Sequence, residues 1–179
     1  AAFPEFRTIG GVHIGVWILV SLLAESLWIS TITGQAMESM ASTIDLSLLV
    51  LLGFRPAVWI VAIAFALANV FFSRRVWYKA IFNAGQNVLA LSAAGVVYVT
   101  LGGTPLVAHS GAPATTLGVP LILPWVAASL VYFIVNTLLV SAAVALSTRR
   151  KLLETWRKEY IYYNSLISSA ALFFLSPLV

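Results

Sequence analysis

The charged residues of this chain fall in a few short clusters, separated by apolar runs that are long enough to cross a lipid bilayer. Only 9% of the 179 residues are charged and 61% are hydrophobic, whereas a soluble domain carries about 25% charged residues. Ten basic and six acidic side chains are too few to solvate a globular surface of this size. The pattern predicts an all-α fold, a polytopic membrane helix bundle.

The apolar runs locate the expected helices, since a crossing needs about 20 apolar residues. One run is interrupted by Gly53 and Pro56, and proline removes a backbone donor and disfavours helix in the residue before it. This run is therefore one broken crossing or two short helices, such as a re-entrant pair. Five to six transmembrane helices are expected, over residues 9–32, 43–72, 78–101, 119–146 and about 160–178.

Basic residues mark two junctions between these runs, whereas the connection at residues 102–118 carries no charge. The positive-inside rule predicts that both junctions face the cytoplasm, provided that residues 43–72 make one net crossing. The net charge of +4 then reflects contact with anionic lipid headgroups, and no nucleic-acid partner is predicted. The junction residues are Arg74, Arg75 and Lys79, and Arg149, Arg150 and Lys151.

The segment after the second junction has a different character. Residues 152–163 pair Glu154 with Lys158 at i,i+4 and are predicted to form a helix on the cytoplasmic membrane surface. Residues 1–179 are predicted to form a single transmembrane domain. The apolar stretch that ends at Val179 predicts that a further helix follows it.

Amide side chains form the largest polar group inside the predicted spans. Asn83, Gln86 and Asn87 share one helical face, and Asn69 and Asn136 lie in neighbouring runs. One interpretation is a set of hydrogen bonds between helices, each worth about 1 kcal/mol or less. The other is a polar pocket that receives a small ligand.

Three further side chains are candidates for a role inside the membrane. Glu25 lies within the first span. One interpretation is a carboxylic acid that is protonated or bonded to a neighbouring helix, and the other is a proton-coupled or cation-binding group. Asp45 is expected to be an interfacial cap, because it lies near the start of its run. His13 is a candidate ligand for a pigment or haem iron, although a lone membrane histidine is more often a hydrogen-bonding group. No cofactor is predicted.

Signatures of catalysis are missing from the sequence. It has no P-loop, no dinucleotide fingerprint, no serine nucleophile elbow and no paired carboxylates in one segment. Cysteine is absent and the two histidines do not form a spaced pair, so no metal site is predicted. The chain is therefore predicted not to be an enzyme.

Two segments resemble a known membrane region. Residues 81–91 read Ile-Phe-Asn-Ala-Gly-Gln-Asn-Val-Leu-Ala-Leu, and residues 133–140 read Phe-Ile-Val-Asn-Thr-Leu-Leu-Val, followed by a basic turn and Trp156. Together they are similar to the N-terminal multi-helix region of bacterial HD-GYP phosphodiesterases and some diguanylate cyclases, over about residues 45–164. The resemblance implies a sensory or anchoring module whose cytoplasmic output domain turns over cyclic di-GMP. Neither the His-Asp dyad nor the Gly-Gly-Asp-Glu-Phe signature of such domains occurs in this chain.

Two other functions stay open on the sequence. The broken run before a polar helix also resembles the substrate-binding membrane component of energy-coupling-factor vitamin transporters, which implies a small-solute transporter using the same amides as ligand contacts. The other open function is that of an accessory subunit in a larger electron-transfer or photosynthetic complex. The predicted partners are the lipid bilayer and helices of a second copy or of other membrane subunits.

Overall fold

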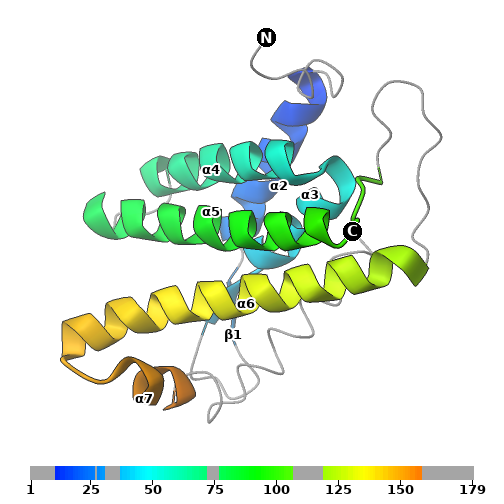
Figure 1. Ribbon diagram of the computed structural model, residues 1–179. Helices are drawn as coiled ribbons and strands as arrows, with labels where there is room; N and C mark the ends of the chain where they lie inside the picture. The colour runs from blue at the N-terminus through cyan, green and yellow to red at the C-terminus, as the bar shows by residue number, and fades with distance from the viewer. Residues whose placement is uncertain (1–10, 27, 31–36, 72–76, 107–118, 159–179) are drawn as a thin grey trace.

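A computed structural model describes residues 11–26, 28–30, 37–71, 77–106 and 119–158 (Figure 1). This part of the chain is helical apart from one short antiparallel strand pair, in which Ile29 pairs with Glu38. The predicted helical class is therefore confirmed for it. Its elements are α2 (Gly11–Ser26), β1 (Trp28–Ser30), β2 (Met37–Ser39), α3 (Ala41–Leu52), α4 (Phe54–Phe71), α5 (Trp77–Thr100), α6 (Val119–Thr148) and α7 (Leu152–Trp156).

The first predicted span is wrong at its C-terminal end, because α2 stops at Ser26 and a strand follows. The Ser26 hydroxyl donates a hydrogen bond to the Leu23 carbonyl at 2.6 Å, and serine side chains commonly compete in this way with the helical backbone. The β-branched Ile29 then favours extended chain. With 16 residues, α2 is about 24 Å long, shorter than a hydrocarbon core of about 30 Å.

Three helices form a layer. Figure 1 shows α4, α5 and α6 side by side in this order and alternating in direction, with α2 crossing behind them, and α2 packs against α3 and α4. The start of α5 and the end of α6 therefore lie at the same end of the layer. Lys79 and the Arg149 turn therefore lie at one end of the bundle, and that this end faces the cytoplasm stays a prediction. Arg74 and Arg75 lie outside the described residues.

Two of the described helices are long and apolar enough to cross a membrane: Trp77–Thr100 and Ile122–Thr148. Only 22% and 33% of their apolar windows are buried inside the bundle, whereas the core helix of a soluble protein is mostly buried. The apolar stretches of the other long helices are shorter: His13–Ser26, Ala41–Leu52 and Phe54–Ala68. The count of five to six crossings stays a prediction, and residues 160–178 lie outside the described part.

The predicted break at Gly53 is where α3 ends and α4 begins, and the chain changes direction there (Figure 1). Gly53 has φ 88° and ψ 175°, a conformation that is essentially restricted to glycine. The segment after α5 covers the break: the Leu106 N–H donates to the Val50 carbonyl at 2.9 Å, and Pro105 lies against Gly53. Irregular backbone at membrane depth requires such cover.

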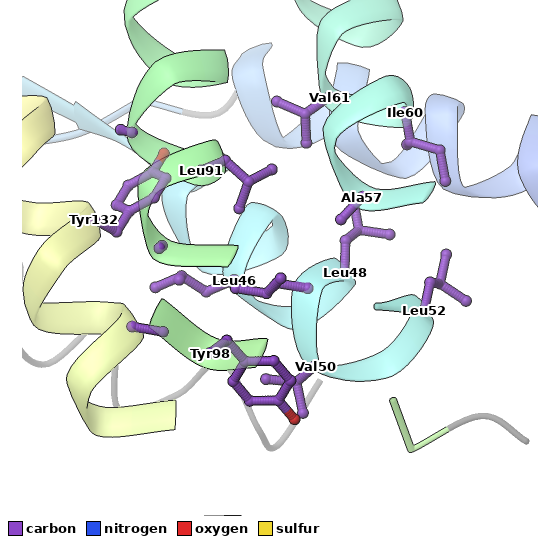
Figure 2. Packing of buried hydrophobic residues seen from close by; sticks show 14 of the residues in the cluster. Leu46, Leu48, Val50, Leu52, Ala57, Ile60, Val61, Leu91, Tyr98 and Tyr132 are labelled. Atoms are coloured by element: carbon purple, nitrogen blue, oxygen red, sulfur yellow. The ribbon is translucent and has the colours of Figure 1, made fainter. Parts of the chain in front are cut away.

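The interior of the bundle is built around α3, nine of whose twelve residues are buried. A helix that is buried on all sides belongs to the middle of a bundle rather than to its surface. Figure 2 shows its leucine and valine side chains packed against those of α4, α5 and α6. The labelled residues are Leu46, Leu48, Val50, Leu52, Ala57, Ile60, Val61, Leu91, Tyr98 and Tyr132.

Candidate functional site

Asp45 lies in the middle of this interior. It sits in the second turn of α3 and is 0% exposed. The expectation that it caps a helix at the interface is wrong, because the N-cap residue of α3 is Met40, which makes no side-chain capping bond. The physical reason is that α3 is enclosed by other helices, so the start of this apolar run does not face the lipid headgroups.

Tyr132 of α6 supplies the polar partner of Asp45. Its hydroxyl oxygen lies 3.0 Å from Asp45 Oδ2 and 3.2 Å from Asn87 Oδ1, and the whole side chain is buried. One phenol thus joins α3, α5 and α6. Sequence reasoning missed Tyr132. The available signal was a tyrosine in the middle of an apolar span, four residues before Asn136, because a buried phenol usually needs a hydrogen-bond partner.

The orientation of the Asn87 amide follows from its second contact. Its Nδ2 donates to the backbone carbonyl of Asn83 at 2.9 Å. Turning the amide over would bring its oxygen against that carbonyl oxygen, where neither atom has a hydrogen. The side-chain oxygen of Asn87 is therefore the atom that faces Tyr132. Asn83 takes part through its backbone.

A second interhelical contact lies one helical turn along α6. Gln86 Nε2 of α5 donates to Asn136 Oδ1 of α6 at 2.6 Å, and Gln86 is only 8% exposed. Asn136 follows Tyr132 by four residues, so both project from one face of α6 toward α5. Of the predicted amides, Gln86 and Asn136 are hydrogen-bonded to each other between α5 and α6, and Asn87 contacts Tyr132 of α6.

The other sequence candidates are dispersed. Glu25 is partly buried near the end of α2, within electrostatic range of Asp45 and Tyr132. Asn69 belongs to α4, with its side chain outside the described part. His13 is exposed in the first turn of α2. Within the part of the chain that the structure describes, no group of three or more His, Cys, Asp or Glu is placed to hold a metal ion.

Next to Asn136, α6 also contacts α7, which forms the first part of the segment predicted to be a surface helix. The Trp156 indole N–H of α7 donates to Thr137 Oγ1 at 3.0 Å, and the neighbouring Thr155 is buried. The Thr137 hydroxyl in turn donates to the Phe133 carbonyl at 2.8 Å. The side-chain hydrogen bonds described above that join α6 to α3, α5 and α7 therefore all come from residues 132–137 of α6.

Comparison with models of protein families assigns the chain to a family. The family model of MASE9 matches residues 16–179, which is nearly the whole chain. The chain belongs to the MASE9 family. MASE domains are membrane sensor domains of signalling proteins, so the membrane and sensor parts of the predicted resemblance agree with the family. Searches of curated proteins and of solved structures gave no match to this MASE9 chain.

The contribution of the Gln86–Asn136 hydrogen bond to stability can be measured in a double-mutant cycle. Gln86→Leu and Asn136→Leu are each expected to lower the free energy of unfolding by about 1 kcal/mol, because each removes the hydrogen bond and leaves the other amide without this partner. The double variant should lose less than the sum of the two. The measurement is detergent-induced unfolding followed by far-UV circular dichroism. Strictly additive losses would show that the two amides do not interact.

Proposed function

We propose that this MASE9 chain is the non-enzymatic membrane sensor and anchor of a bacterial signalling protein. It lies in the cytoplasmic membrane as a multi-pass domain with both basic junctions inside. It controls a cytoplasmic domain that makes or degrades cyclic di-GMP. The family match over residues 16–179 carries the sensor role, and the resemblance of residues 81–91 and 133–140 to the membrane regions of such enzymes supports the output class.

The position of α7 supports a route from the membrane to the output. Tyr132 contacts the interior helix α3, and Thr137, less than two turns along, contacts Trp156 of α7. Small translations or rotations of a helix are a common way in which membrane and soluble proteins transmit a change of state. A shift of α6 that alters the Tyr132 contact also alters the Trp156 contact, because one rigid helix carries both.

The experiment uses the complete reading frame expressed in bacterial cells, with cyclic di-GMP quantified in extracts. Trp156→Phe removes the indole donor while keeping an aromatic ring, and it should change the cyclic di-GMP level several-fold. The matched control is Trp77→Phe, because Trp77 is 72% exposed at the start of α5; it should leave the level unchanged. A reading frame without an output domain, or equal behaviour of both variants, would refute the proposal.

The membrane arrangement has its own test. Single cysteines introduced at Lys79, Arg150 and Gly102 can be labelled with an impermeant maleimide in intact and opened cells, since the chain has no cysteine of its own. The first two are expected to react only after the cells are opened, because they belong to the basic junctions, and the third should react in intact cells. Labelling of the Lys79 and Arg150 positions from opposite sides would contradict the proposed orientation.

A further inference from the structure

The Tyr132 hydroxyl has one hydrogen and two acceptors. A phenol donates a single O–H, whereas Asp45 Oδ2 and Asn87 Oδ1 both lie within hydrogen-bond distance of its oxygen. Asn87 cannot supply the missing hydrogen, because its amide N–H group is turned toward the Asn83 carbonyl. If Asp45 is ionised, three oxygen atoms share one hydrogen, and one of the two short contacts lacks a proton.

A proton on Asp45 Oδ2 completes the chain of donors. Asp45 then donates to Tyr132, Tyr132 donates to Asn87, and Asn87 donates to the Asn83 carbonyl. Each group gives one hydrogen and each contact receives one. The series runs without a break from α3 through α6 to α5.

The other carboxyl oxygen leads to the same protonation state. Asp45 Oδ1 is buried and has no hydrogen-bond partner among the described residues. In a carboxylate this atom would carry about half of a negative charge without compensation, and burying an unpaired charge is far more costly than burying a neutral carbonyl. In the protonated acid Oδ1 is such a carbonyl oxygen.

The titratable groups around Asp45 offer no buried positive charge within the described part of the chain. From α2 the facing group is Glu25, a second carboxyl, and from α6 it is Tyr132. The described part of α4 contains one titratable residue, Arg55, which is exposed in the first turn of that helix. The titratable residues of α5 lie in its first and last turns, so its facing side chain here is the neutral Asn87.

We propose that Asp45 is a proton-binding site, and that its bound proton holds the interior helix α3 to α6 through Tyr132. Loss of the proton leaves a carboxylate that competes with Asn87 for the single Tyr132 hydrogen, which loosens the junction of three helices. The ligand of this site is thus the proton itself. The effect of proton release on the signalling output rests on the proposed sensor function. The protonation of Asp45 itself does not depend on that function.

The protonation state can be observed directly, because Asp45 is the only aspartate in the sequence. The full chain is made by cell-free synthesis with ¹³C at the aspartate carboxyl carbon and is reconstituted in phosphatidylcholine vesicles. Solid-state NMR then gives one carboxyl signal. At neutral pH the signal of a protonated acid is expected, with conversion to carboxylate at alkaline pH. A carboxylate signal at neutral pH would overturn the proposal.

Two substitutions test the regulatory part in the complete signalling protein, with cyclic di-GMP output compared at acidic and alkaline pH. Asp45→Asn supplies a neutral N–H donor to Tyr132 at all pH values, so its output should match the acidic wild-type output and lose its pH response. Glu25→Gln is the matched control on the neighbouring carboxyl and should keep a response. If the Asp45→Asn variant retains the full pH response, regulation by this proton is overturned.

The two measurements separate the possible failures. A protonated Asp45 in a protein without any cyclic di-GMP output would sink the proposed sensor function and the regulatory part together, while the proton site stands. An ionised Asp45 in a protein that signals normally would remove the proton site and leave the sensor function intact.

Discussion

Tyr132→Ala is expected to lower the free energy of unfolding by about 3 kcal/mol, the low end of the range for removing a buried aromatic ring. Tyr132 is 0% exposed and packs in the central cluster between α5 and α6 (Figure 2). The low end applies because, in a membrane, the truncated side chain loses packing contacts but little transfer free energy, since lipid is as apolar as the protein interior. Detergent-induced unfolding followed by circular dichroism measures the loss.

Tyr132→Phe separates the ring from the hydroxyl. It keeps the packing and removes only the group that bonds Asp45 and Asn87, so a smaller loss of about 1–2 kcal/mol is expected. If Tyr132→Ala costs no more than Tyr132→Phe, the ring does not contribute to the packing of the interior and the position of α6 is wrong.

Gly95→Ala is expected to destabilise the bundle by about 1–3 kcal/mol, the usual cost of overpacking a tight interior. A Cβ atom at Gly95 would overlap the Phe54 ring of α4, so α4 and α5 must separate or Phe54 must leave its position. Adding Phe54→Ala should remove most of the additional cost, because the overlapping ring is then gone. Thermal unfolding in detergent micelles, followed by circular dichroism, gives the comparison.

Gly85 is the matched control in the same helix. An added Cβ there would meet nothing within 4 Å, and glycine in a helix interior is less favourable than alanine by about 1 kcal/mol. Gly85→Ala should therefore stabilise the protein slightly, while Gly95→Ala destabilises it. The same sign for both substitutions would show that the close contact between Phe54 and α5 is absent.

The hydrogen bonds of the interior make α6 the helix that connects the others. It is held to α3 and α5 by Tyr132, to α5 again by Asn136, and to α7 by Thr137. An interior polar network of this kind favours one arrangement of the helices over others. A change at one member, such as the proton of Asp45, alters the others through the same helix.

The features that the sequence predicted well depend on short stretches of chain. The scarcity of charge and the length of the apolar runs indicate hydrocarbon as solvent, without knowledge of which helices touch. The break at Gly53 follows from local backbone chemistry, and the shared face of Asn83, Gln86 and Asn87 follows from the helical repeat. These inferences need no partner helix, which is why they agree with the structure.

The interior position of Asp45 and the role of Tyr132 required the tertiary structure. α3 is apolar around its whole circumference, so its sequence carries no periodic signal that distinguishes an interior helix from one that starts at the lipid interface. Asp45 and Tyr132 are 87 residues apart in sequence and meet only because α5 and α6 pack as neighbours around α3. Local patterns report what solvent a segment prefers, whereas long-range packing decides which polar side chains are removed from that solvent together.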